Sequence, residues 1–166
     1  EEIMAGQVWR LLTGHFVHLG WQHLLLNLAG LVLTYLVFYR YLIGGQGMIA
    51  FFGIAFGVSA GLLLFNPELG WYVGLSGVLH GLLMFGAVLA VFDKTNPNNK
   101  IYIVLVVLLL IKIGYEQIIG PLPTSAVIKN YKIITVAHLY GAASGIILAV
   151  IFLVRRYLIQ IKRSTA

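Results

Sequence analysis

The sequence predicts an all-α polytopic membrane protein, organised as a single helical domain over residues 1–166. Apolar residues make up 60% of the chain, charged residues only 10%, and the mean hydropathy is +0.95. A soluble domain carries roughly a quarter charged residues, so we expect this chain to lie in a bilayer. Five segments are also long and apolar enough to cross a bilayer, which takes about 20 residues per helix.

The five predicted spans cover residues 23–41, 46–65, 76–92, 101–119 and 135–157. Short connections rich in helix-breaking residues separate them: Gly44-Gly45, Asn66-Pro67, residues 93–100 and Pro121-Leu122-Pro123. Residues 1–22 are too polar to cross, and their aromatic and basic side chains favour an interfacial loop on the outer side of the membrane. The chain contains no cysteine, which excludes disulfides and thiolate chemistry.

Basic residues between the spans define the expected orientation. If the first span runs inward, the outer side holds Arg10, Lys129 and Lys132, and the inner side holds Arg40, Lys94, Lys100, Arg155, Arg156, Lys162 and Arg163. The positive-inside rule then places the C-terminus in the cytoplasm and starts the first, third and fifth spans at the outer face. The net charge of +6 does not indicate a nucleic-acid partner, because the basic residues are not gathered into one stripe. The expected surroundings are the lipid bilayer.

Polar side chains inside the predicted spans are costly, so each is a candidate for function. They are His23, Asn27, Ser76, His80, Lys112, Glu116, Gln117 and His138. Four of them lie near the starts of the first, third and fifth spans and therefore share one depth: His23, Asn27, Ser76 and His138. The third span is about 25 Å long, shorter than the roughly 30 Å hydrocarbon core. We therefore expect the glycine-rich entry Gly70–Gly77 to dip into a water-filled cavity.

These residue types suit nucleophilic acyl transfer. A neutral histidine can take the proton of a serine hydroxyl, which makes Ser76 the expected nucleophile. Asn27, the ring N–H of His23 and the backbone N–H of Ser76 are candidate oxyanion donors. Because the spans contain no aspartate to orient the base, we expect a Ser–His dyad rather than a triad. Plainer roles stay open for single residues: a helix N-cap for the serine, and hydrogen bonds between helices for the histidine or asparagine.

A set of motifs, in this order and over most of the chain, resembles the rhomboid intramembrane proteases. The motifs are Trp9-Arg10, His18 followed by His23-x-x-x-Asn27, Gly74-Leu75-Ser76-Gly77 and Ala137-His138-x-x-Gly141-x-x-x-Gly145. The resemblance implies a rhomboid-like core of six transmembrane helices, five of them present here and the first expected upstream of Glu1. It also implies a transmembrane protein substrate, with Ser76 as nucleophile, His138 as base, and an oxyanion site formed by His23, Asn27 and the Ser76 amide.

Two further features look like the rhombosortase branch of that family. His80 stands where many rhomboids carry a tyrosine that stacks on the catalytic histidine, and Lys112-x-x-x-Glu116-Gln117 follows later in the chain. The branch is linked with cleaving C-terminal glycine-glycine sorting tails on bacterial surface proteins. This resemblance implies a bacterial cytoplasmic membrane protein whose active site faces the periplasmic side.

Three questions about single residues stay open. His80 follows Ser76 by one helical turn and competes as the base, although the family motif favours His138. Lys112 and Glu116 form either a self-compensating buried pair or a site for polar substrate atoms. His15, His18 and His23 would need further converging ligands to bind zinc, so we expect no metal and instead expect His18 to brace the loop or the oxyanion donors.

Two other classes of protein compete with a protease. An inactive rhomboid-like protein that binds or escorts client membrane proteins would typically lack the serine or the histidine, and both are present here. A small transporter or channel would carry polar residues through to the cytoplasmic side, whereas the inner halves of these spans are apolar. We therefore predict an intramembrane serine endopeptidase that uses no cofactor.

Overall fold

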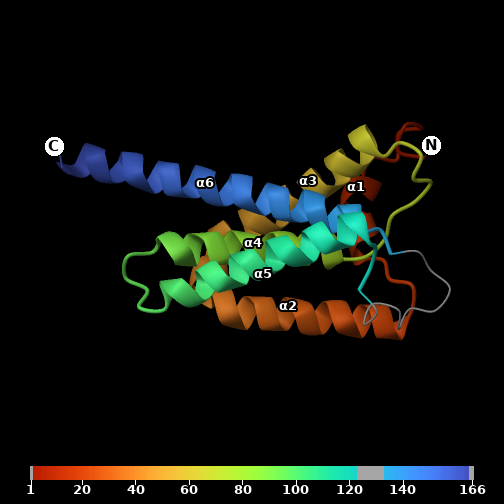
Figure 1. Ribbon diagram of the computed structural model, residues 1–166. Helices are drawn as coiled ribbons and strands as arrows, with labels where there is room; N and C mark the ends of the chain where they lie inside the picture. Colours follow the sequence, from red (N-terminus) through yellow and green to blue (C-terminus); the bar gives the residue numbers. More distant parts are fainter. Residues whose placement is uncertain (1, 123–132, 165–166) are drawn as a thin grey trace.

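The computed structural model describes residues 2–122 and 133–164. Within these residues it contains six α-helices and one 3-10 helix (Figure 1). In chain order they are α1 (Arg10–Thr13), η1 (Gly14–Phe16), α2 (Trp21–Leu42), α3 (Gly44–Phe65), α4 (Ser76–Phe92), α5 (Asn99–Ile118) and α6 (Val136–Ser164). The prediction of an all-α fold is confirmed for the described part of the chain.

Helices α2 to α6 correspond to the five predicted spans. Among the described residues, four of these helices are long and apolar enough to cross a membrane, and α4 is a shorter apolar helix of 17 residues. Helix α6 runs on past the predicted end at residue 157, because the following residues contain neither glycine nor proline to stop it. The segment expected as a plain loop, residues 1–22, contains α1 and η1. Lys129 and Lys132, expected on the outer side, lie outside the described residues.

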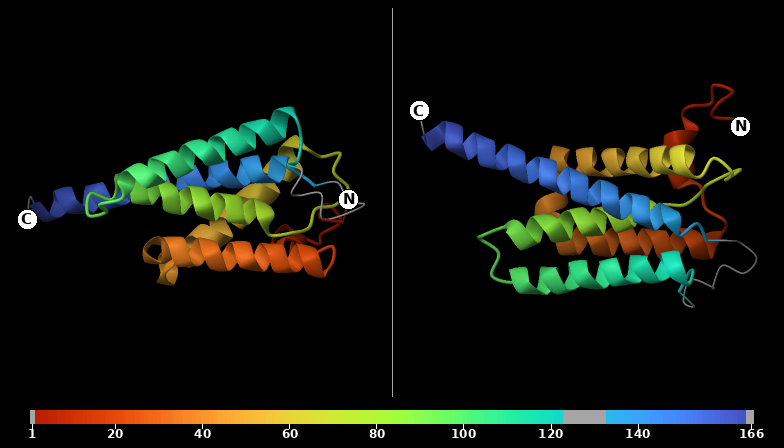
Figure 2. Two further views of the ribbon diagram at one scale, coloured as in Figure 1. Left: turned by 60° about the horizontal axis from the view of Figure 1, so that its bottom comes forward. Right: turned by 45° about the horizontal axis from the view of Figure 1, so that its top comes forward.

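Helices α2, α4 and α6 begin at the same end of the bundle, where α5 ends (Figures 1 and 2). We call this the site end. The N-terminal segment and the connection between α3 and α4 lie there too, whereas the C-terminus lies at the opposite end (Figure 1). Alternating helix directions therefore bring the first turns of three helices together, as the order of the spans predicts.

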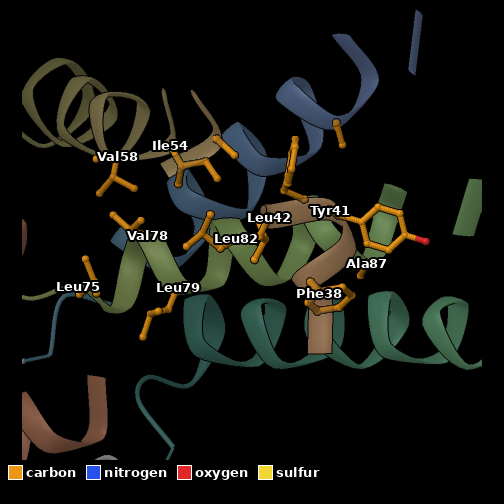
Figure 3. Packing of buried hydrophobic residues seen from close by; sticks show 14 of the residues in the cluster. Phe38, Tyr41, Leu42, Ile54, Val58, Leu75, Val78, Leu79, Leu82 and Ala87 are labelled. Atoms are coloured by element: carbon orange, nitrogen blue, oxygen red, sulfur yellow. The ribbon is translucent and has the colours of Figure 1, made fainter. Parts of the chain in front are cut away.

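Helix α4 forms the centre of the bundle and packs against α2, α3, α5 and α6. Its apolar side chains meet those of α3 and the end of α2 in one cluster, which Figure 3 shows from close by. The outer helices are less buried: 11% of the most apolar stretch of α5 and 22% of that of α2 lie inside the bundle. Their exposed apolar side chains suit contact with lipid tails, which are as apolar as leucine.

Small residues bring the backbones of α4 and α6 into direct contact. A Cβ atom added to Gly77 would lie 2.9 Å from the Ala137 carbonyl oxygen, and one on Gly141 would collide with the Gly77 carbonyl. One turn further along, a Cβ on Gly145 would collide with the Gly81 carbonyl. Close approach of this kind is how membrane helices associate without a hydrophobic driving force between them. It fixes the first turns of α4 and α6 side by side.

The N-terminal segment is fastened to α3 by His15, which is fully buried. Its Nε2–H points at the Ala55 carbonyl oxygen and at Ser59 Oγ, each 3.0 Å away, and Ser59 in turn donates to the Leu11 carbonyl oxygen. His15 Nδ1 is buried without a hydrogen-bond partner in the described part of the chain. Burial lowers the pKa of His15 below its ordinary value, so this side chain docks the segment in its neutral form.

Candidate active site

Ser76 is the first residue of α4 and lies at the site end. The chain reaches it through non-helical residues 66–75, and the backbone N–H of Gly74 donates to the Gly14 carbonyl oxygen at 3.1 Å. Gly74 has a φ of +112°, a region that side chains other than glycine rarely adopt. A Cβ atom there would also come within 2.8 Å of His23 Nε2. Glycine at this position therefore permits both the turn into α4 and the approach of α2.

His138 lies in the first turn of α6 and faces Ser76. Its Nε2 is 3.1 Å from Ser76 Oγ, and the residue is only 5% exposed. This is hydrogen-bond distance, so a neutral imidazole with a free lone pair on Nε2 can accept the serine proton. The structure thus brings together the two side chains that the sequence predicts as nucleophile and base.

His80 is the other histidine beside Ser76, and both of its ring nitrogens are occupied. Nδ1 lies 2.7 Å from the Ser76 carbonyl oxygen, which can only accept, so Nδ1 carries the proton. Nε2 lies 2.7 Å from Lys112 Nζ, an ammonium that can only donate, so the Nε2 lone pair is used. His80 has no lone pair left for the serine hydroxyl, and this geometry favours His138 as the base.

Glu116 reaches His138 from α5, and Lys112 accompanies it one turn earlier. Glu116 Oε2 lies 2.7 Å from His138 Nδ1, and its Oε1 lies 2.7 Å from Lys112 Nζ. The Glu116 side chain is fully buried, whereas that of Lys112 is 28% exposed. The ion pair that the sequence suggested between Lys112 and Glu116 is therefore present. The dyad was expected because the spans contain no aspartate, but a glutamate from a neighbouring helix contacts the histidine instead.

The two predicted oxyanion side chains lie one turn apart on α2, beside Gly74. His23 Nδ1 accepts a hydrogen bond from the Leu19 N–H at 3.3 Å, so the ring proton is on Nε2, the nitrogen next to Gly74. Asn27 is 5% exposed, and its Nδ2 is buried without a hydrogen-bond partner in the described residues. A buried amide donor without a partner is uncommon in folded proteins. Both groups can donate to an acceptor that enters beside Gly74.

His18 lies against His23 rather than beside Ser76. The two rings meet edge to face, with centroids 4.9 Å apart, and His18 Nδ1–H donates to the Phe16 carbonyl oxygen at 3.0 Å. His15, considered with them as a zinc ligand, instead points its Nε2 at α3. From this position the His18 ring contacts the His23 ring, and a bracing role for His18 stays a prediction.

Tyr72 also borders the site, and the sequence analysis did not single it out. Its hydroxyl donates to the Gly74 carbonyl oxygen at 2.9 Å and lies 3.1 Å from where a Cβ of Gly77 would stand. Burial raises the pKa of Tyr72, while the Gly77 N–H and the Ser76 hydroxyl act in the opposite direction. An aromatic residue inside the glycine-rich entry to α4 is the signal that could have indicated it.

Within the described residues, one group of side chains comes close enough to hold a metal ion. His80, Glu116 and His138 each offer a ligand atom within 4.8 Å of the others. However, the rings of His80 and His138 stack with an interplanar angle of 16°. One ion cannot lie in the planes of two parallel rings at ligand distance. Lys112 Nζ already contacts both His80 and Glu116. The donor set suits an ammonium better than a divalent metal.

This helical bundle, with a serine–histidine pair and an ion pair at one end, has the features of a multi-pass membrane protein. The sequence profile of the rhomboid domain matches residues 5–155. A curated relative, RHOMBOID-like protein 1 of Arabidopsis thaliana, is 35% identical over 155 residues, which make up 90% of this chain and 36% of the relative. The chain therefore spans about a third of the length of that relative. No solved structure gives a significant match.

The chain belongs to the rhomboid domain family. The match covers every described side chain discussed above at the site end.

Proposed function

We propose that this rhomboid-domain protein is an intramembrane serine endopeptidase with Ser76 as nucleophile and His138 as general base. The observation that carries the proposal is the distance of 3.1 Å between Ser76 Oγ and His138 Nε2. The competing base, His80, has both ring nitrogens engaged elsewhere. Rhomboid-family membership supports the same chemistry, because proteins of this family are typically serine proteases.

The proposed acylation begins when Ser76 Oγ bonds to the scissile carbonyl carbon and its proton passes to His138 Nε2. The carbon–nitrogen bond then breaks, and the leaving amine takes that proton from His138. In the second half, a water molecule gives a proton to His138 and attacks the ester carbonyl. Ser76 Oγ leaves and recovers the proton. These steps balance without a metal or a cofactor.

Three N–H donors are proposed to stabilise the negative oxygen of each tetrahedral intermediate. They are Asn27 Nδ2, His23 Nε2 and the backbone N–H of Ser76. The start of α4 favours negative charge there, because the first N–H groups of a helix have no partner inside the helix. Asn27 Nδ2 supports this role most directly, since it is buried and lacks a partner in the described chain.

We further propose that the protein belongs to the rhombosortase branch and cleaves glycine-glycine sorting tails of membrane-anchored substrates. Support comes from His80, which stacks on His138 in place of a tyrosine, and from Lys112 and Glu116 beside both rings. The proposed location is the bacterial cytoplasmic membrane, with the site end facing the periplasm. Basic residues on the far part of α6, such as Arg155 and Arg156, agree with a cytoplasmic C-terminus.

The test is labelling of the full-length protein with a serine-directed fluorophosphonate in detergent micelles. We expect labelling of the wild type and none of Ser76→Ala, with matching loss of cleavage of a reporter that carries a glycine-glycine tail. Equal labelling of the two proteins, with the Ser76→Ala variant folded, would refute the proposal. It would favour the alternative of a rhomboid-like protein that binds or escorts client membrane proteins without cleaving them.

A further inference from the structure

The polar groups at the site end form a closed ring of hydrogen bonds that starts and ends on Ser76. From Ser76 Oγ the ring passes to His138, then to Glu116, Lys112 and His80, and returns to the Ser76 carbonyl oxygen. Four of its five contacts are 2.7 Å long and the fifth, at the serine hydroxyl, is 3.1 Å. We call this set the hydrogen-bond ring. The proposed chemical steps use only its first contact, between Ser76 Oγ and His138.

Every proton in the hydrogen-bond ring has one consistent position. The Ser76 carbonyl and the lysine ammonium fix His80 as the neutral tautomer with its proton on Nδ1. The Glu116 carboxylate accepts from Lys112 through Oε1 and from His138 through Oε2. His138 therefore carries its proton on Nδ1 and keeps a free lone pair on Nε2, which is the tautomer that a general base requires.

We propose that Glu116 is a positioning residue that holds His138 in its base tautomer, and that Lys112 is a second positioning residue that orients Glu116 and occupies His80. This inference rests on the proposed serine protease function and adds a third member to the expected dyad. The serine, the histidine and the glutamate then come from three different helices, α4, α6 and α5.

Two properties of Glu116 support this role. Its side chain is fully buried, so a negative charge beside His138 is weakly screened and stabilises the imidazolium that forms when Ser76 loses its proton. Its two oxygens also have separate partners, Lys112 and His138, so the carboxylate cannot rotate without losing one of them. Orientation and charge thus come from the same group.

The role of Lys112 can be tested because a carboxylate and an amide differ in their hydrogen bonds. Both oxygens of a carboxylate accept, whereas an amide has one accepting oxygen and one donating NH2 group. In a Glu116→Gln variant, Lys112 can only donate, so the amide must turn its oxygen toward Lys112 and its NH2 toward His138. His138 Nδ1 then has to accept, which moves the ring proton to Nε2 and blocks proton transfer from Ser76. If Lys112 is also replaced by methionine, the amide is free to turn its oxygen back to His138.

A purely structural ion pair predicts a different pattern. In that case either substitution lowers the stability of the protein, and removing both partners leaves the tautomer of His138 unaffected. A structural pair also allows the second substitution to restore stability, because it removes the unpaired charge of Lys112. Only the positioning role predicts that folded Glu116→Gln carries the His138 proton on Nε2 and that the second substitution returns it to Nδ1. The tautomer and the kcat of folded protein therefore separate the two explanations.

The experiment compares the full-length wild type with Glu116→Gln, the double variant Lys112→Met/Glu116→Gln, and Ser76→Ala. A matched control double variant, Lys100→Met/Glu116→Gln, replaces the lysine at the opposite end of α5, where it is exposed. Cleavage of the tail reporter gives kcat and KM, and the 15N shifts of labelled histidine rings report the tautomer, with His138 assigned by difference from His138→Asn. A chelator is present throughout, because loss of Lys112 leaves three ligand groups close together.

We expect Glu116→Gln to lower kcat by about 10³- to 10⁴-fold with little change in KM, and to move the His138 proton to Nε2. Lys112→Met/Glu116→Gln should recover at least about tenfold of kcat and return the proton to Nδ1, whereas the Lys100 control should recover nothing. If Glu116→Gln retains kcat within about tenfold of wild type, or the Lys112 double variant shows no recovery, the inference is wrong.

Two further outcomes are distinguishable. If Glu116→Gln does not fold, the test is made on the double variant Lys112→Met/Glu116→Gln, which has no charge at either position. A folded double variant without Ser76-dependent turnover overturns the inference. If the wild type itself shows no more turnover than Ser76→Ala, the proposed protease function fails first, whatever the glutamate variants do.

Discussion

The imidazole rings of His80 and His138 stack face to face, with centroids 4.0 Å apart and planes 16° from parallel. The two stacked rings have different hydrogen-bond partners. His80 donates through Nδ1 and accepts through Nε2 from an ammonium, whereas His138 faces a carboxylate on one side and a hydroxyl on the other. Because two stacked imidazolium ions would repel each other, the stack favours a single protonated ring, and the partners assign the proton to His138 during the proposed reaction.

The first prediction separates the two histidines. His138→Ala should lower kcat by about 10²- to 10⁴-fold, the range that a general base contributes. His80→Ala should cost about tenfold or less, because it removes a stacking surface and a partner of Lys112 but no proton acceptor for Ser76. Single-turnover cleavage of the tail reporter measures both. A loss of activity in His80→Ala alone, with His138→Ala fully active, would contradict the assignment of the base.

The second prediction concerns Asn27. Its replacement by alanine should lower kcat by about 10²- to 10³-fold with KM nearly unchanged, because an oxyanion donor acts mainly in the transition state. Asn98→Ala is the matched control, since that asparagine is exposed at the opposite end of the bundle. Asn27→Ala should not lower the melting temperature through a lost hydrogen bond at Nδ2, because this buried donor has no partner in the described residues. A large fall in melting temperature with unchanged kcat would instead indicate a structural role.

Hydropathy and helix direction are enough to predict most of the fold. The ends of α4 coincide with the predicted span, and the starts of α2, α3, α5 and α6 differ from prediction by one or two residues. The reason is physical: apolar length and helix breakers decide where a membrane helix begins and ends. The same reasoning brings Ser76 and His138 to one depth, because spans that start on one side align their first turns.

The contact between Glu116 and His138 could not be predicted in this way. Hydropathy gives the length of α5 but not its rotation about its own axis, which depends on side-chain packing against α4 and α6. From the sequence, Glu116 could therefore be predicted only as a partner of Lys112, one helical turn earlier. Tyr72 was missed for a related reason, since the path of its loop depends on the bend at Gly74 and on a backbone hydrogen bond to Gly14.

The third prediction tests the contact between α4 and α6. Gly141→Ala adds a methyl group that collides with the Gly77 carbonyl, so the two helices must separate. We expect a loss of about 1–3 kcal/mol in stability, and a fall in kcat because His138 moves away from Ser76. Gly114→Ala is the matched control: it lies in α5 with no atom within 4 Å of the added Cβ, and alanine there should raise stability by roughly 0.5–1 kcal/mol. Equal melting temperatures for the two variants in the same detergent would contradict this account of the packing.

The fourth prediction follows from the buried His15. Burial lowers its pKa in the folded protein, so the unfolded chain, with a histidine pKa of about 6.5, binds the proton more readily than the folded one. The stability contributed by neutral His15 is therefore fully present above about pH 6.5 and is lost as the pH falls from there toward the lower pKa of the folded state. Protonation would also place an N–H on Nδ1, which is buried without a partner in the described residues. Thermal unfolding in detergent should be measured at about pH 7.5 and about pH 5.5, roughly one unit either side of the ordinary histidine pKa. The melting temperature should fall more between these two pH values for the wild type than for His15→Gln. The other histidines contribute equally to both proteins, so an identical drop in the two would show that His15 does not couple the N-terminal segment to pH.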